Sequence, residues 1–223
     1  MLSDLIHPLH LCFALGPVAV YLLLVGMLNV SSRPFVTTGA RDAAALGIGI
    51  GGLVIVGPLQ LLIPTATVFH WGPLVWLLLT IFYTLMLTLI VLLLRPRIVI
   101  YNMPADRIRP VLAGLVSELD NEARWAGACL VMPKLGVQLN VESVQSLRNV
   151  QLVSAGHQQS YEGWRRLEKA LIVALKDTQG VRNPLGFSLV AGGIFLVTVM
   201  GFSLVQDAGA VAQSVQKLFQ AEE

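Results

Sequence analysis

The chain has 223 residues, of which 55% are hydrophobic and only 13% are charged, and its mean hydropathy is +0.73. Because about a quarter of the residues of an average soluble domain are charged, this composition argues against an ordinary soluble protein and predicts an integral membrane protein. The formal net charge of +2 is too small, and the basic residues are too dispersed, for nucleic acid to be an expected partner.

Four uncharged, apolar stretches predict four transmembrane helices, at about residues 9–29, 43–63, 72–94 and 185–206. The third stretch runs from Gly72 to Leu94 and would reach about 35 Å, enough to cross a hydrocarbon core of about 30 Å. Since no Lys or Arg precedes the first stretch, we expect it to be retained as a helix rather than cleaved as a signal peptide.

The second and fourth stretches are rich in glycine, whereas the third is bulky and leucine-rich, as suits a helix that faces lipid. Gly47 and Gly51 have the small-xxx-small spacing that lets two helix backbones approach closely. We therefore expect close helix packing at the glycines of these two stretches, namely Gly47, Gly51, Gly52, Gly192 and Gly193.

The basic residues predict the orientation, because cytoplasmic segments retain Lys and Arg. Of the 15 lysines and arginines, all but Lys217 lie between the first two stretches or within residues 95–184. We expect a protein of the cytoplasmic (inner) membrane with both termini outside, an outer turn at 64–72 and an amphipathic outer tail at 207–223. Cys12 and Cys129 would then lie in different compartments and form no disulfide.

Residues 95–184 predict a cytoplasmic α+β domain, while the segment at 29–42 is expected to be a short loop. Alternating and amphipathic patterns predict strands at 97–102, 125–132, 137–141 and 150–155, and helices at 106–119 and 160–176. The order is βαβββα, which a sheet of about four strands covered on one face by two helices would satisfy. The predicted fold is an all-α membrane bundle, with three helices in residues 1–94 and a fourth at 185–206, and this domain is inserted before the fourth.

Three histidines, His7, His10 and His70, fall at the predicted outer surface and are the candidate metal ligands. Imidazoles at one depth would suit a metal or haem iron. The alternative is that they anchor helix ends among the lipid headgroups, as amphipathic residues there commonly do. Only Asp4 offers a carboxylate that would orient such ligands, so we favour the anchoring role and expect no cofactor.

Four arginines are candidates for lipid or partner contact: Arg95, Arg97, Arg165 and Arg166. Anionic lipid attracts such residues by about 1 kcal/mol each near the membrane surface. A signal that stops membrane insertion explains Arg95 and Arg97 equally well. Arg165 and Arg166 could also be ordinary helix surface that pairs with Glu162.

No motif in the sequence indicates catalysis. Glu118, Asp120 and Glu122 cluster after a predicted helix, but a general acid needs a buried setting, and we expect this loop to be solvated. The chain has no glycine-rich phosphate loop, paired CxxC or GxSxG segment. No Asp, Glu, Lys or Arg lies within a predicted span, which argues against ion-coupled transport.

Three functional hypotheses remain open. The first is a non-catalytic membrane scaffold or accessory subunit whose cytoplasmic domain docks a partner or another copy, so that the expected partners are lipids and other membrane proteins or the chain itself. The second is a homo-oligomeric passive channel or pore with the glycine-rich second helix at its axis. The third is a metal or haem protein that uses the outer histidines.

Overall fold

The computed structural model describes residues 8–59, 74–144, 149–157, 159–176, 178–206 and 209. The chain forms two compact units. The first comprises residues 1–24, 45–88 and 189–223, and the second comprises residues 25–44 and 89–188. Because the boundaries fall within the apolar helices, the second unit contains the ends of these helices as well as the sheet.

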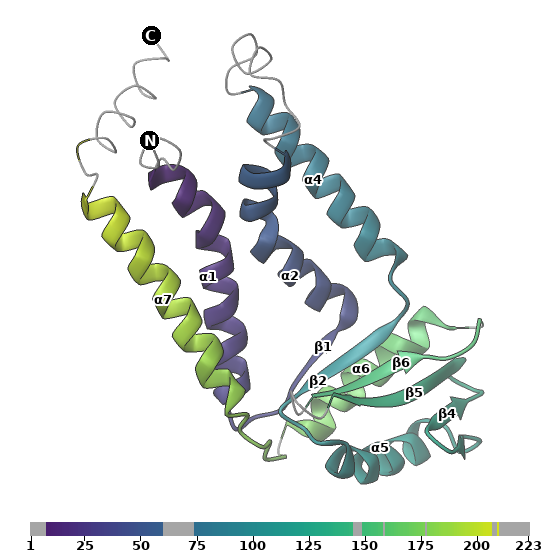
Figure 1. Ribbon diagram of the computed structural model, residues 1–223. Helices are drawn as coiled ribbons and strands as arrows, with labels where there is room; N and C mark the ends of the chain where they lie inside the picture. The colour runs from purple at the N-terminus through teal and green to yellow at the C-terminus, as the bar shows by residue number, and fades with distance from the viewer. Residues whose placement is uncertain are drawn as a thin grey trace. The chain divides into compact units, whose positions relative to one another are not determined.

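The four apolar helices predicted from the sequence are present: α1 (Pro8–Val30), α2 (Gly39–Val54), α4 (Leu74–Leu93) and α7 (Leu185–Gln206) (Figure 1). Each is long and apolar enough to cross a membrane, α2 together with the residues that continue it to Gly57. At its end α2 passes into a π-helical turn, η1 (Ile55–Leu59), which contains Gly57 and Pro58. The predicted end of the second span at 60–63, the outer turn at 64–72 and nearly all of the tail at 207–223 lie outside the described residues.

The second unit is built on one antiparallel sheet of six strands in the order β1-β2-β6-β5-β4-β3. All five pairings between neighbouring strands are antiparallel. The strands are β1 (Phe35–Thr38), β2 (Arg97–Tyr101), β3 (Arg124–Ala126), β4 (Cys129–Met132), β5 (Val137–Val144) and β6 (Asn149–Ser154).

Two predictions about this sheet were wrong. The expected loop at 29–42 contains a strand, β1, which pairs with β2. The expected single strand at 125–132 is a hairpin, in which β3 and β4 are joined at Gly127, whose φ of 66° favours glycine. The order is therefore βαββββα after β1, with six strands instead of about four. The predicted hairpin between β4 and β5 is confirmed.

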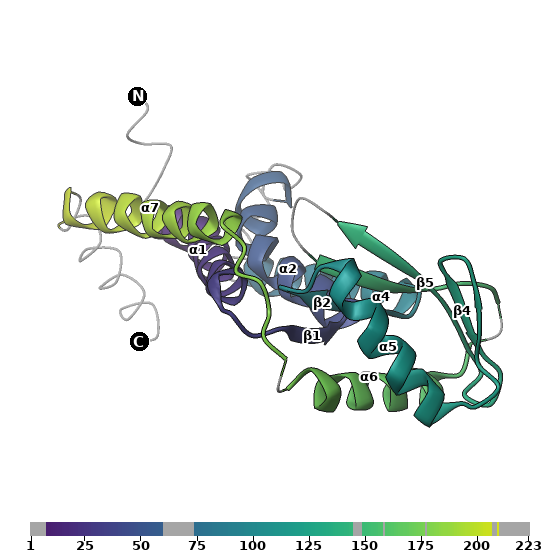
Figure 2. The ribbon, with the colours of Figure 1, turned by 90° about the horizontal axis from the view of Figure 1, so that it is seen from below.

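Helices α5 (Ala105–Leu119) and α6 (Tyr161–Leu175) cover one face of the sheet (Figures 1 and 2). On β2, Ile98 and Ile100 point into the core beneath these helices, whereas Val99 and Tyr101 point to the opposite face, because side chains alternate along a strand. The core consists of apolar side chains from both helices and from the inner face of the sheet: Ile98, Ile100, Met103, Ile108, Leu112, Val116, Leu130, Met132, Leu135, Val137, Leu139, Val141, Val150, Leu152, Trp164, Leu167, Leu171 and Leu175.

Helix α6 is positioned by its first turn. Ser160 is the N-cap, and its hydroxyl accepts a hydrogen bond from the Gly163 amide over 3.2 Å. Gly163 lies so close to the β4–β5 turn that an added Cβ would sit 2.1 Å from the Leu135 carbonyl oxygen. The glycine thus lets the helix backbone approach the sheet, and this approach determines which side of α6 faces outward.

Candidate functional site

Two residues of the first turn of α2 contact side chains of β2 that point away from α5 and α6. Tyr101 donates its hydroxyl hydrogen bond to Asp42 Oδ1 over 2.5 Å. Arg97 lies over Gly39, where an added Cβ would be 2.1 Å from Arg97 Cγ. Since β1 ends at Thr38 and α2 begins at Gly39, the sheet continues into the helix with no linker.

Asn102 joins the end of β2 to the end of α1. Its side chain is fully buried, and its φ of 60° places the backbone in the left-handed region. Asn102 Nδ2 donates to the carbonyl oxygens of Leu28 at 2.5 Å, Ser31 at 3.1 Å and Arg33 at 3.3 Å. The last carbonyls of a helix have no partner within the helix, so this one amide satisfies groups that would otherwise cost free energy.

The return segment between α6 and α7 is fastened at the same place. The Gly180 amide donates to the Ser32 carbonyl over 2.8 Å, and the Asn183 amide donates to the Asn29 carbonyl over 3.0 Å. Asn183 is buried, and its Oδ1 accepts from the Leu185 amide at the start of α7. Within the second unit, the ends of α1 and α7 are thus held together by main-chain hydrogen bonds.

A third contact joins α2 to α6. Arg41 Nη1 donates to Glu168 Oε1 over 2.9 Å, and the Glu168 side chain is only 12% exposed. Sequence reasoning missed this pair, and it also missed Asn102, because neither belongs to a motif. A polar residue on the buried side of a predicted amphipathic helix was the only available signal for Glu168.

The outward side of α6 combines exposed apolar groups with cations. Tyr161 is 76% exposed, Ile172 46% and Val173 72%. Three exposed cations lie among them and have no hydrogen-bond or ion-pair partner among the described residues. We call these six residues the α6 outer face: Tyr161, Arg165, Lys169, Ile172, Val173 and Lys176.

Of the predicted arginines, Arg165 belongs to the α6 outer face, and Arg166 is paired with Glu162 at 2.6 Å beside it. A shallow hollow of about 240 Å³ is lined by these residues and Lys169. Arg95 is exposed after α4, whereas Arg97 is half-buried against Gly39 on the other face of the sheet. The four arginines therefore do not form one surface.

The predicted histidine cluster lies largely outside the described residues, which include His10 but neither His7 nor His70. His10 is exposed on α1, and its ring centroid is 6.0 Å from that of Trp76 on α4. Within the described ranges no group of three or more His, Cys, Asp or Glu side chains is arranged to hold a metal ion.

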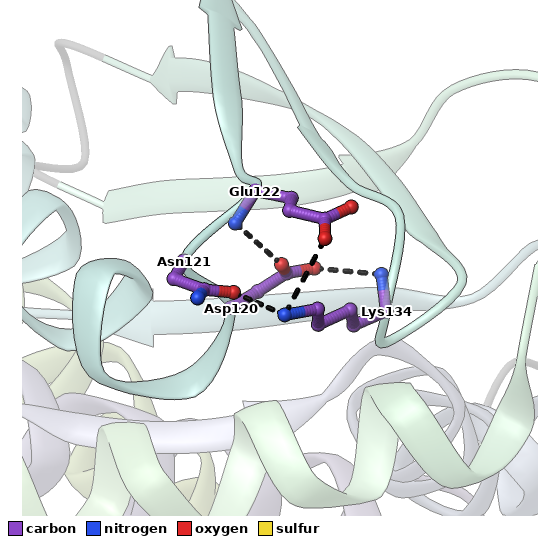
Figure 3. Close-up of polar contacts among 4 residues, drawn as sticks. All are labelled: Asp120, Asn121, Glu122 and Lys134. Atoms are coloured by element: carbon purple, nitrogen blue, oxygen red, sulfur yellow. Dashed lines mark hydrogen bonds and ion pairs between the residues drawn. The ribbon is translucent and has the colours of Figure 1, made fainter.

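Asp120 lies in a different setting from the solvated loop that we expected. It is only 2% exposed, and its carboxylate accepts hydrogen bonds from the amides of Glu122 at 2.9 Å and Lys134 at 2.8 Å (Figure 3). Lys134 Nζ in turn contacts Asn121 and forms an ion pair with Glu122 at 3.5 Å. Asp120 thus fastens the end of α5 to the β4–β5 turn, which is a structural role.

The glycines of α2 lie against neighbouring helices of the first unit. Added Cβ atoms would be 2.2 Å from Leu87 at Gly47 and 3.0 Å from Tyr83 at Gly51. Tyr83 also donates its hydroxyl hydrogen bond to the Gly47 carbonyl over 2.6 Å. One side of α2 thus packs against α4.

The other predicted packing glycines differ in how closely a neighbouring helix approaches them. An added Cβ at Gly52 would be 2.0 Å from the Phe13 carbonyl oxygen of α1, and one at Gly193 of α7 would be 2.7 Å from Leu23. At Gly192 the nearest such contact is 3.9 Å. Gly52 and Gly193 therefore lie at close helix contacts with α1, while Gly192 has room for a side chain.

Comparison with protein-family models, with curated proteins and with solved structures finds no match to this chain. The function must therefore be inferred from the geometry of the second unit.

Proposed function

We propose that the protein is an integral membrane scaffold or accessory subunit, whose α+β domain is held at the cytoplasmic surface of the inner membrane and docks a partner. The four apolar helices cross the membrane with both termini outside. This orientation rests on the distribution of Lys and Arg along the sequence.

The observation that carries the proposal is the anchorage of the domain by Asn102. A buried amide that donates to three carbonyl oxygens at the end of α1 holds β2 against that helix. Together with the direct passage of β1 into α2, it gives the sheet little freedom to move relative to the helix ends. A domain whose own fold includes the ends of the apolar helices is suited to presenting a surface near the membrane.

The two other hypotheses gain less support. The pore hypothesis places the glycine-rich side of α2 at the axis, yet Gly47, Gly51 and Gly52 lie against α4 and α1. A metal site at the outer histidines depends on His7 and His70, which lie outside the described residues. No observation favours either one over the scaffold.

The test is quantitative affinity purification of the full chain from native membranes. Three forms are compared: the native chain, Asn102→Asp, which disrupts the anchorage, and the control Gly114→Ala, which changes an open site on α5. We expect a second protein, or additional copies of the chain, in constant ratio with the native chain and with the control, and at least a several-fold loss with Asn102→Asp.

A monodisperse monomer without any co-purifying protein would refute the scaffold function. Ion flux through liposomes that contain only the purified chain would favour the pore instead.

A further inference from the structure

The contact between Arg41 and Glu168 brings α6 to the place where an apolar helix begins. Arg41 lies in the first turn of α2, and the stretch that is long and apolar enough to cross a membrane starts at Gly39. Arg41 Nη1 reaches Glu168 Oε1 over 2.9 Å. Arg165 and Ile172, three residues before and four residues after Glu168, are its neighbours on the helix surface, and both are exposed. The α6 outer face therefore begins beside the start of α2.

The chain that leaves α6 leads directly to two other apolar helices. Helix α6 ends at Leu175, and the Gly180 amide then donates to the Ser32 carbonyl, just after the end of α1, over 2.8 Å. Helix α7 begins soon afterwards, at Leu185. Within the second unit, α6 is thus tied to α2 along its length and to the ends of α1 and α7 beyond its last turn. Because the proposed function places these helix ends at the cytoplasmic membrane surface, α6 lies close to the lipid headgroups.

The α6 outer face has the composition of a helix that lies on a membrane. Tyr161, Arg165, Lys169 and Val173 follow one another at intervals of four residues and so form one row along the helix. All four are exposed. Helices at a membrane surface combine basic and apolar side chains in this way, and tyrosine is enriched at the boundary between lipid and water.

Helix α6 also carries an excess of positive charge. Each of its two carboxylates is paired, Glu162 with Arg166 at 2.6 Å and Glu168 with Arg41 at 2.9 Å. The exposed cations that remain on the helix, with no partner among the described residues, are Arg165 and Lys169.

Helix α5, which covers the same face of the sheet, differs in both respects. Two acidic and two basic residues balance each other among its exposed side chains: Asp106, Arg107, Arg109 and Glu118. The structure describes all of α5, and none of its large apolar side chains is exposed. Of these two helices, excess positive charge and exposed apolar groups therefore occur together on α6.

We propose that the α6 outer face binds the headgroups of anionic lipids. Arg165 and Lys169 complement a lipid phosphate in charge, and both line the shallow hollow of about 240 Å³ on this helix. Attraction to a charged bilayer acts within a Debye length of about 8 Å, so it requires a helix that is held close to the membrane surface. This inference rests on the membrane placement in the proposed function and names the lipid class that this face recognises.

An acidic protein segment is the competing ligand, and the contact with α2 argues against it. Beside the start of α2 the headgroups themselves supply negative charge, so an acidic segment would have to displace them from a helix that is attached to the same membrane. The same argument applies to an acidic surface of a second copy. Two α6 outer faces would repel each other, because they carry charge of the same sign.

The experiment places a photo-crosslinking amino acid at Val173 of the full chain, and a matched probe at Ser117, an exposed residue of α5. Each form is studied in native membranes, in vesicles of phosphatidylcholine alone and in vesicles that also contain phosphatidylglycerol. Mass spectrometry identifies the adducts. In the mixed vesicles we expect phosphatidylglycerol adducts from Val173 well above the share of that lipid, and at least several-fold fewer from Ser117.

Two variants that carry the Val173 probe test the role of charge. Arg165→Glu/Lys169→Glu should reduce the phosphatidylglycerol adduct by about tenfold, because attraction becomes repulsion. Arg165→Lys/Lys169→Arg keeps both charges and should retain most of the adduct. Both variants should unfold at the same temperature as the native chain, since the two side chains are exposed and unpaired among the described residues. The comparison of the two vesicle compositions requires no charge variant and so tests the proposal independently.

The outcomes separate this inference from the proposed function. Val173 adducts that do not favour phosphatidylglycerol, or that are unchanged after charge reversal, would overturn the inference. Crosslinking of Val173 in native membranes to an acidic protein or to a second copy, in place of lipid, would overturn it as well but would support the scaffold function. Phosphatidylglycerol adducts from a chain that co-purifies with no other protein or copy would support the inference and refute the scaffold function.

Discussion

Arg41 Nη1 donates a hydrogen bond to Glu168 Oε1 over 2.9 Å and so joins the first turn of α2 to α6. The Arg41 side chain is 72% exposed, whereas that of Glu168 is 12% exposed. The pair thus consists of an accessible cation that covers a largely buried carboxylate. It connects an apolar helix directly with the helix that carries the α6 outer face.

A double-mutant cycle measures this pair. Arg41→Met leaves the Glu168 carboxylate without its donor and should lower the free energy of unfolding by about 1–2 kcal/mol, while Glu168→Gln should cost less. We expect a coupling energy of about 1 kcal/mol from thermal unfolding of the full chain in detergent. Strictly additive effects would mean that the ion pair contributes nothing to stability.

The two carboxylates near Lys134 should respond very differently to removal. Asp120→Ala strips the acceptor from two main-chain amides at a site that is 2% exposed, and should destabilise the domain by about 2–4 kcal/mol. Glu122→Gln removes only an exposed ion pair and should cost less than about 1 kcal/mol. Denaturant unfolding of both variants checks the difference. Equal losses would contradict the structural role of Asp120.

Replacing two helix glycines by alanine should change the free energy of unfolding in opposite directions. At Gly163 the new Cβ would meet the Leu135 carbonyl oxygen at 2.1 Å, so Gly163→Ala should destabilise the domain by about 2 kcal/mol or more. At Gly114 nothing lies within 4 Å, so Gly114→Ala should stabilise it by about 0.5–1 kcal/mol through helix propensity. Thermal unfolding of both variants provides the test. A stabilising Gly163→Ala would show that α6 does not pack closely on the β4–β5 turn.

The apolar helices and most elements of the domain could be predicted because they depend on local periodicity. Uncharged runs are long, and α5 and α6 repeat apolar residues at helical spacing. The strand β1 could not be predicted from its four residues, because its stability comes from pairing with β2, some sixty positions later in the chain. The β3–β4 hairpin was missed because its turn sequence, Gly127-Ala128, lacks the Asn-Gly or Asp-Gly signal.

The candidate site was less predictable than the fold. Arg165 and Arg166 were identified from charge alone, but Tyr161, Ile172 and Val173 were not, because apolar residues on the polar side of an amphipathic helix belong to no motif. Asn102 carries no motif either. Its role depends on the meeting of the ends of α1 and β2, which are distant in sequence. Contacts of this kind follow from the tertiary structure and leave no local pattern.

Close packing in the first unit predicts a contrast between two glycines. Gly52→Ala would drive a Cβ to 2.0 Å from the Phe13 carbonyl oxygen, a backbone atom that cannot rotate away, and should lower the unfolding temperature by several degrees. In Gly16→Ala of α1 the new Cβ would meet nothing within 4 Å, so the unfolding temperature should stay unchanged or rise slightly. The measurement is thermal unfolding in detergent micelles. Equal behaviour of the two variants would argue against a close α1–α2 contact.

Three substitutions at Asn102 separate its hydrogen bonds from its backbone conformation. Asn102→Gly keeps the left-handed φ without strain but loses the donor to three carbonyl oxygens, and should cost about 1–3 kcal/mol. Asn102→Ala loses the same donor and should lower the free energy of unfolding by about 1 kcal/mol more than Asn102→Gly, because alanine is strained in the left-handed conformation. Asn102→Asp places a carboxylate against the same carbonyl oxygens and should be the worst of the three, at about 3 kcal/mol or more at neutral pH.

Hydrogen exchange at the amides of β2 and at the end of α1, in the full chain, provides the measurement, because it reports on the anchorage itself. Protection from exchange should be highest in the native chain and should decrease from Asn102→Gly to Asn102→Ala to Asn102→Asp. Asn140→Asp, at an exposed position of β5, is the matched control and should change little. If Asn102→Ala and Asn102→Asp exchanged at the same rate, the side chain would not be acting as a donor. The anchorage would then rest on the main-chain contacts of Gly180 and Asn183.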